Sequence, residues 1–112
     1  MTVDTFKQCI DNLSAEYRLH LPQKWLELDR LWSGLISEAS DPGDITDLHR
    51  ELHTLVGTAK TMGLPAVTDA ARAAEDFLEP YIAHGTIPAG AEQANFSRLL
   101  DNLKRSADIA QD

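Results

Sequence analysis

The residues that could do chemistry gather on one flank of a predicted helix in the middle of the chain. His53 lies one step outside an apolar stripe that includes Leu52 and Leu55, so its imidazole should face solvent. Four other residues share this flank at helical spacing: His49, Val56, Gly57 and Lys60. A neutral imidazole nitrogen is a good nucleophile near pH 7, so an exposed histidine can accept a transferred group. A lone surface histidine, however, is more often only solvated.

Gly57 is an unusual residue for the interior of a helix. A glycine there costs about 1 kcal/mol relative to alanine. We expect Gly57 to lie on the outward side, one turn from His53, where bare backbone makes room for a group beside the imidazole. Close packing against an adjacent side chain is the alternative explanation.

A metal site is a second interpretation of the two histidines. His49 and His53 are four residues apart, a spacing that can clasp a metal ion on a helix. Two ligands are too few, and no carboxylate or cysteine follows at matching spacing on that face. We therefore predict no metal ligands here and expect His49 to be a solvated neighbour that tunes local charge. His20 and His84 lie near predicted helix ends and should be ordinary surface residues.

The helix that carries this flank has the most regular apolar pattern in the chain. Asp44 is its predicted N-cap, and Gly63 should end it, with Pro65 starting the next helix. Its apolar residues recur in steps of three and four, which indicates a bundle-facing stripe: Ile45, Leu48, Leu52, Leu55, Ala59 and Met62.

The other predicted helices complete an all-α fold. A short helix over Asp4–Leu19 should end before Pro22, which suits the first turn of a second helix. The helix that begins at Pro65 either kinks or ends at Pro80. We predict an antiparallel up-down four-helix bundle, with the additional short N-terminal helix across one end. Four aromatic residues should lie in its core: Trp25, Trp32, Phe77 and Phe96.

Composition narrows the class of protein. The 112 residues suffice for one domain, and no apolar run approaches the length of a membrane span. The net charge of -8 disfavours binding to nucleic acid. Residues 1–6 lack the basic start of a secretory signal, and Cys9 is the single cysteine. We expect a cytoplasmic, monomeric protein that binds neither nucleic acid nor membrane.

The segment 53–63 resembles the signature of histidine phosphotransfer (HPt) domains. The matching features are the histidine, an apolar residue two positions later, a glycine four later, a pair of small residues, and a second glycine ten later. Arg50 lies three residues before the histidine, and the run 71–75 is similar to the family's next helix. Leu21-Pro22 is similar to the entry into the family's second helix. The resemblance covers nearly the whole chain, which implies a single HPt domain over 1–112, stand-alone or excised from a hybrid sensor kinase.

The resemblance implies a function in signalling. HPt domains accept a phosphoryl group from the aspartate of one receiver domain and pass it to the aspartate of another. They have no nucleotide site and no ATP-dependent kinase activity. The implied partners are receiver domains of a hybrid histidine kinase or of response regulators, and His53 would carry the phosphoryl group. The receiver would supply Mg²⁺, so no cofactor is expected on this chain.

The sequence departs from the signature at Val56, where the family usually has a lysine that contacts phosphoryl oxygens. Lys60, Arg50 and Arg72 could substitute for that lysine, or all three could be ordinary solvated charge. The missing lysine also leaves open a degenerate HPt-like module that docks a receiver without taking its phosphate. In the family the tip of the first helix contributes apolar contacts to the receiver, which would here involve Phe6 and Ile10.

Overall fold

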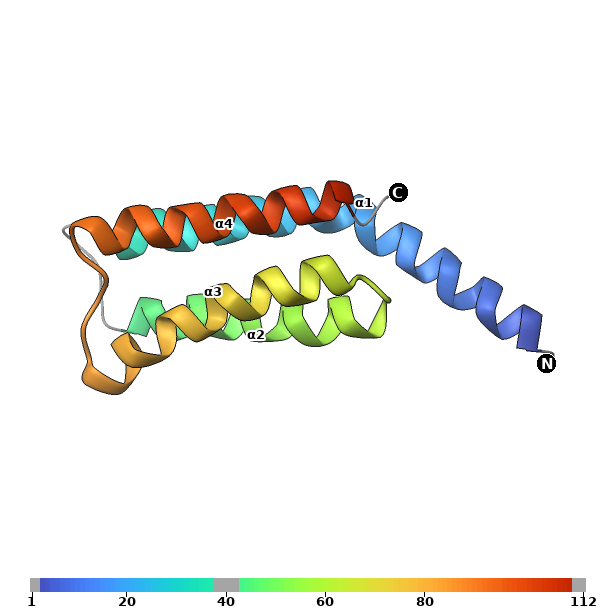
Figure 1. Ribbon diagram of the computed structural model, residues 1–112, viewed down its shortest axis with the longest axis horizontal. Helices are drawn as coiled ribbons and strands as arrows, with labels where there is room; N and C mark the ends of the chain where they lie inside the picture. Colours follow the sequence, from blue (N-terminus) through green and yellow to red (C-terminus); the bar gives the residue numbers. More distant parts are fainter. Residues whose placement is uncertain (1–2, 38–42, 110–112) are drawn as a thin grey trace.

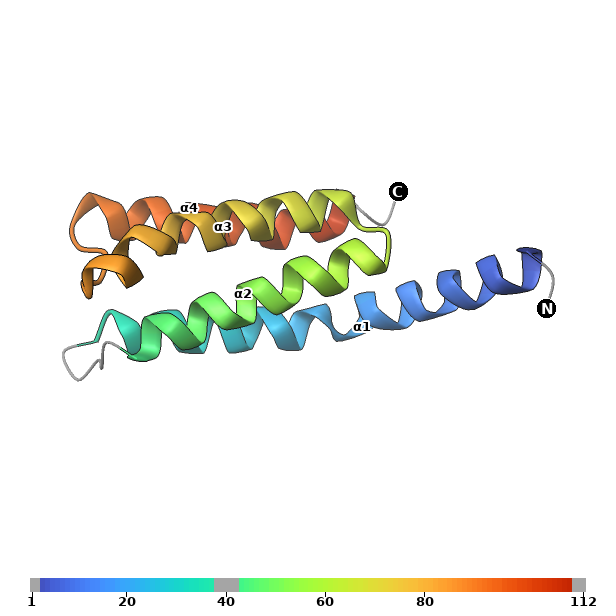
Figure 2. The same cartoon turned by 90° about the horizontal axis from the view of Figure 1, so that it is seen from below.

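The computed structural model of the protein describes residues 3–37 and 43–109. Its elements are α1 (Val3–Leu35), α2 (Gly43–Thr61), α3 (Pro65–His84) and α4 (Ala91–Ile109). Successive helices run in opposite directions, and the bundle measures 53 × 22 × 19 Å (Figures 1 and 2). The described residues contain no strand. The predicted all-α antiparallel bundle is confirmed.

Each helix packs against two neighbours. α2 contacts α1 and α3, and α4 contacts α3 and α1. The predicted stripe on α2 is buried, apart from Met62, which follows the helix and is half-buried. Trp32 and Phe96 lie in the core with ring centroids 4.5 Å apart, while Trp25 and Phe77 pack against the core from its edge. No helix among the described residues is both long enough and apolar enough to cross a membrane.

The prediction of a separate short helix before Pro22 is wrong, because α1 is one continuous helix. A proline inside a helix costs about 3 kcal/mol through a lost hydrogen bond and a steric clash. The helix continues because Leu21, Leu28 and Leu35, at seven-residue spacing, are all buried in the core. α1 bends where its first part leaves the bundle, and that first part projects beyond the other helices instead of lying across their end (Figure 1).

α2 and α3 both end in a tight turn at a glycine. Gly63 and Gly85 follow α2 and α3 with positive φ values of 73° and 66°. In both turns the next amide donates to a carbonyl five residues earlier, from Leu64 to Ala59 and from Thr86 to Tyr81. α3 continues through Pro80 to His84, so of the two predicted alternatives, a kink or an end at Pro80, the end is wrong.

Candidate functional site

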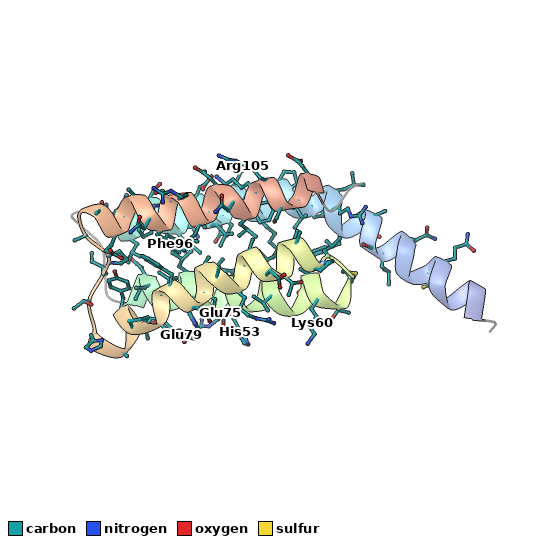
Figure 3. All side chains as sticks on the ribbon, viewed as in Figure 1. His53, Lys60, Glu75, Glu79, Phe96 and Arg105 are labelled. Carbon is teal, nitrogen blue, oxygen red and sulfur yellow. The ribbon has the colours of Figure 1, made fainter. Side chains whose placement is uncertain are left out.

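His53 is exposed, yet one of its ring nitrogens is held by a buried carboxylate. The side chain is 73% exposed, and its Nδ1 lies 2.7 Å from Oε1 of Glu75, whose side chain is only 11% exposed. An ionised carboxylate can only accept hydrogen bonds, so the proton is assigned to Nδ1. The exposed nitrogen, Nε2, then carries the lone pair. Figure 3 shows both residues along the α2–α3 seam.

Glu75 is the site residue that the sequence analysis missed. It follows Ala74 on the side of α3 that packs into the bundle, where Ala71, Ala74 and Leu78 are fully buried. A buried glutamate is rare unless it is paired, so an acid beside these alanines was the available signal. The resemblance of the run 71–75 to the family's helix does not by itself give this glutamate a role. The antiparallel packing of α2 and α3 brings it to His53.

A second histidine lies one turn earlier on the same seam. His49 Nε2 is 3.7 Å from Oε1 of Glu75 and 3.7 Å from Oε1 of Glu79. The His49 side chain is only 25% exposed, so the expectation of a solvated neighbour is wrong. The His49 side chain is directed towards α3. The two helices run antiparallel, so position 49 of α2 lies opposite position 79 of α3, and position 53 lies opposite position 75.

Gly57 has open space beside it. A Cβ atom built on Gly57 would meet no atom within 4 Å outside the local helix. Close packing therefore does not explain the glycine, and the alternative explanation is wrong. The bare backbone lies one turn from the exposed imidazole of His53, on the exposed side of α2.

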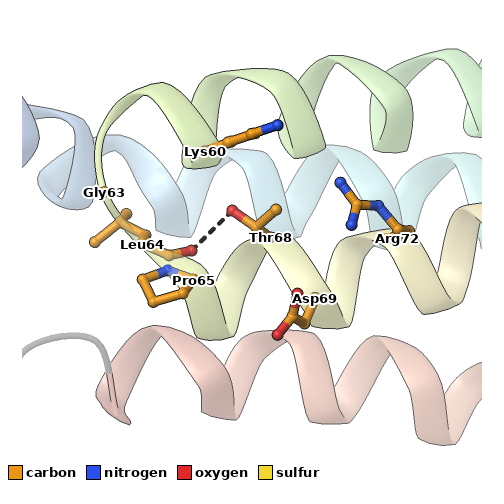
Figure 4. A pocket seen from close by; sticks show the side chains of 7 residues that line it. All are labelled: Lys60, Gly63, Leu64, Pro65, Thr68, Asp69 and Arg72. Carbon is orange, nitrogen blue, oxygen red and sulfur yellow. Dashed lines mark hydrogen bonds between the residues drawn. The ribbon is translucent and has the colours of Figure 1, made fainter.

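Two cations lie near Gly57 on the α2–α3 seam. Lys60 from α2 and Arg72 from α3 line a cavity of about 260 Å³ (Figure 4). The other lining residues are Gly63, Leu64, Pro65, Thr68 and Asp69. Neither cation forms an ion pair within the described part of the chain. Both side chains are exposed and therefore accessible to an anion.

Val56 and Arg50 are the remaining residues of the predicted site. Val56 was expected on the exposed flank, but its side chain is 9% exposed and belongs to the core cluster, so that expectation is wrong. The reason is that the apolar stripe of α2 is wider than strict steps of three and four. Arg50 is exposed and pairs with Asp47 at 3.6 Å, a surface contact of little energetic weight.

Other parts of the chain do not join this site. A second cavity, of about 200 Å³, lies between α1 and α2 and contains none of the predicted site residues. Tyr17 lines it, and burial raises the pKa of its phenol above the ordinary value. His20 and His84 are exposed, as predicted. The side chains of Phe6 and Ile10, predicted to contact a receiver, lie outside the described residues.

Comparison with known proteins agrees with this geometry. Residues 3–108 match the Hpt domain, a span that includes the four helices' packed parts, His53 and Glu75. The chain matched no curated protein and no solved structure. The match extends over nearly the whole sequence, and the helical bundle fits it. The chain therefore belongs to the Hpt domain family, the phosphotransfer modules of two-component signalling.

Proposed function

We propose that the protein relays a phosphoryl group between receiver-domain aspartates and carries it on Nε2 of His53. One observation carries the proposal: an exposed imidazole whose Nδ1 is held at 2.7 Å by the buried carboxylate of Glu75. This contact fixes the ring orientation and the tautomer, which leaves the Nε2 lone pair directed to solvent.

The phosphoryl group can move to His53 without any proton transfer. The Nε2 lone pair of His53 attacks the phosphorus of an aspartyl phosphate, the Nε2–P bond forms, and the bond from phosphorus to the aspartate oxygen breaks. The receiver's carboxylate leaves with its negative charge, and the imidazole becomes positively charged while Nδ1 keeps its proton. The carboxylate of Glu75 stabilises that positive charge, as a buried acid beside a catalytic histidine can. The reverse step delivers the group to a second receiver.

The phosphoryl oxygens also need positioning and charge neutralisation. Gly57 leaves space beside the imidazole, and Lys60 and Arg72 are exposed cations farther along the same seam. They are the cations best placed to replace the lysine that the family has at the position of Val56. The receiver's Mg²⁺ would neutralise the remaining charge.

A docking module without phosphoryl acceptance is the second candidate. It is favoured by the absence of the usual lysine at position 56, where the chain has a buried valine. Under this alternative a receiver would bind the exposed flank of α2, but no phosphate would reach His53.

The test is incubation of the protein with a phosphorylated receiver domain. Acid-labile phosphate should appear on the wild type and on His84→Gln, an exposed histidine changed as a control, but not on His53→Gln. His53 is exposed, but its replacement removes the partner of the buried Glu75 carboxylate, so the free energy of unfolding should fall by about 1–3 kcal/mol. A stable complex with no labelled chain would support docking alone, and label on folded His53→Gln would refute the assignment of His53.

A further inference from the structure

The Nε2 atom of His49 is a buried polar atom without a hydrogen-bond partner among the described residues. Two carboxylate oxygens face it, Oε1 of Glu75 and Oε1 of Glu79, each at 3.7 Å. That distance is too long for a hydrogen bond. Buried polar atoms are rarely left in this state, and an ion or an ordered water is one ordinary explanation.

The three side chains are arranged as metal ligands would be. Their nearest ligand atoms lie within 4.8 Å of one another. Ligand atoms about 2.0–2.1 Å from a zinc ion lie about 3.3–3.6 Å apart in tetrahedral or trigonal geometry. The two separations of 3.7 Å from His49 are close to that value. Glu79 is 59% exposed, so its side chain can move to close the remaining gap.

We propose that His49, Glu75 and Glu79 form a binding site for a divalent first-row transition metal, with Zn²⁺ as the reference ion. One imidazole nitrogen and two carboxylate oxygens are a borderline ligand set that suits Zn²⁺, whereas Mg²⁺ prefers oxygen ligands and retains its waters. The two carboxylates offset the charge of the ion, and water completes the coordination. The ligands come from α2 and α3, so the packing of the two helices forms the site in advance.

The site shares Glu75 with the exposed histidine. The same Oε1 atom lies 2.7 Å from His53 Nδ1, so a bound ion would compete with that imidazole for the carboxylate. This consequence for phosphotransfer rests on the proposed function. The metal site itself does not, because it uses His49 and Glu79 and leaves His53 out of the ligand set.

The experiment is calorimetric titration of the metal-free full chain with Zn²⁺, with and without millimolar Mg²⁺. Glu79→Gln removes an exposed ligand, His49→Gln removes the nitrogen, and Asp76→Asn is a control with the same charge change at an exposed position of α3. His53→Gln tests whether the pair His49 and His53 holds the ion instead. Histidine side-chain NMR of the wild type identifies which ring responds, and circular dichroism checks the fold of each variant.

We expect one Zn²⁺ per wild-type chain, little competition from Mg²⁺, and a shift of the His49 ring resonances. The dissociation constant should rise at least tenfold in Glu79→Gln and His49→Gln, and it should change less than twofold in Asp76→Asn. It should not rise in His53→Gln, because that substitution removes the imidazole that competes for Glu75. Absence of binding, or equal affinity in wild type and Glu79→Gln, would overturn the site. Loss of binding in His53→Gln with retention in Glu79→Gln would assign the ion to the two histidines and also overturn it. These readouts do not involve phosphate, so they are independent of any failure of phosphotransfer.

Discussion

The seam between α2 and α3 has two halves of opposite character, and His53 lies at their boundary. On one side are imidazoles and carboxylates, with His49 and His53 facing Glu75 and Glu79. On the other side are a cavity and the exposed cations Lys60 and Arg72 (Figure 4). Gly57, with open space beside it, lies between His53 and Lys60 on α2.

The two halves of the seam would contribute to phosphotransfer in different ways. Under the proposed function, the acidic half would orient the His53 imidazole and stabilise positive charge on it, while the basic half would neutralise an incoming anion. The basic half would matter most in a chain whose net charge is -8, because the overall field repels phosphate and the carboxylates of a receiver. Substitutions that change one half and spare the other should separate the two contributions.

The largest effect should come from the acidic half. Glu75→Gln keeps the size of the side chain but removes the charge opposite His53, so the single-turnover rate of phosphoryl transfer from a receiver should fall about a hundredfold, or about 2.7 kcal/mol. Glu79→Gln is the matched control, since Glu79 does not contact His53. Equal rates for Glu75→Gln and wild type would show that the contact has only a structural role.

The boundary between the halves should be the next most sensitive position. Gly57→Gln fills the space beside the imidazole, and we expect it to slow transfer about thirtyfold, or about 2 kcal/mol. Gly34→Gln is the control, because Gly34 is also a helical glycine whose Cβ would meet nothing within 4 Å. Normal transfer by a folded Gly57→Gln protein would remove the steric argument.

The basic half should contribute less per residue. Lys60→Ala should slow transfer about tenfold, or about 1.4 kcal/mol, and Arg72→Ala should have a similar effect. Both losses should shrink as ionic strength rises, because exposed charges are screened. Lys24→Ala, at an exposed cation on the other cavity, serves as control. If Lys60→Ala and Lys24→Ala transfer at the same rate, Lys60 is only solvated charge.

The smallest effect concerns stability alone. Gly57→Ala should raise the free energy of unfolding by about 1 kcal/mol, since its Cβ enters open space in a helix. Gly63→Ala should instead lower the stability, because Gly63 has a φ of 73°. Urea denaturation of the two variants measures both changes. A loss of stability in Gly57→Ala would mean that the surroundings of Gly57 are tighter than the structure shows.

The sequence by itself determined the local features of the protein. The stripe from Ile45 to Ala59 on α2, the end of that helix at Gly63 and the exposure of His53 were all predicted correctly. These features depend on side-chain periodicity within one helix and on backbone dihedral angles within one turn. Interactions between near neighbours decide both, so the pattern of residue types is sufficient to predict them.

Only the tertiary structure decided which side chains of different helices contact one another. Glu75 reaches His53 across 22 positions of sequence because α2 and α3 pack antiparallel in one register, which no spacing within α2 can indicate. The carboxylates that face His49, those of Glu75 and Glu79, likewise come from α3, so the residues of α2 alone do not indicate them. Packing also overrode local preference where the core buries Val56 and where α1 continues through Pro22. In each case the free energy of burial or pairing between helices outweighs the preference of the single segment.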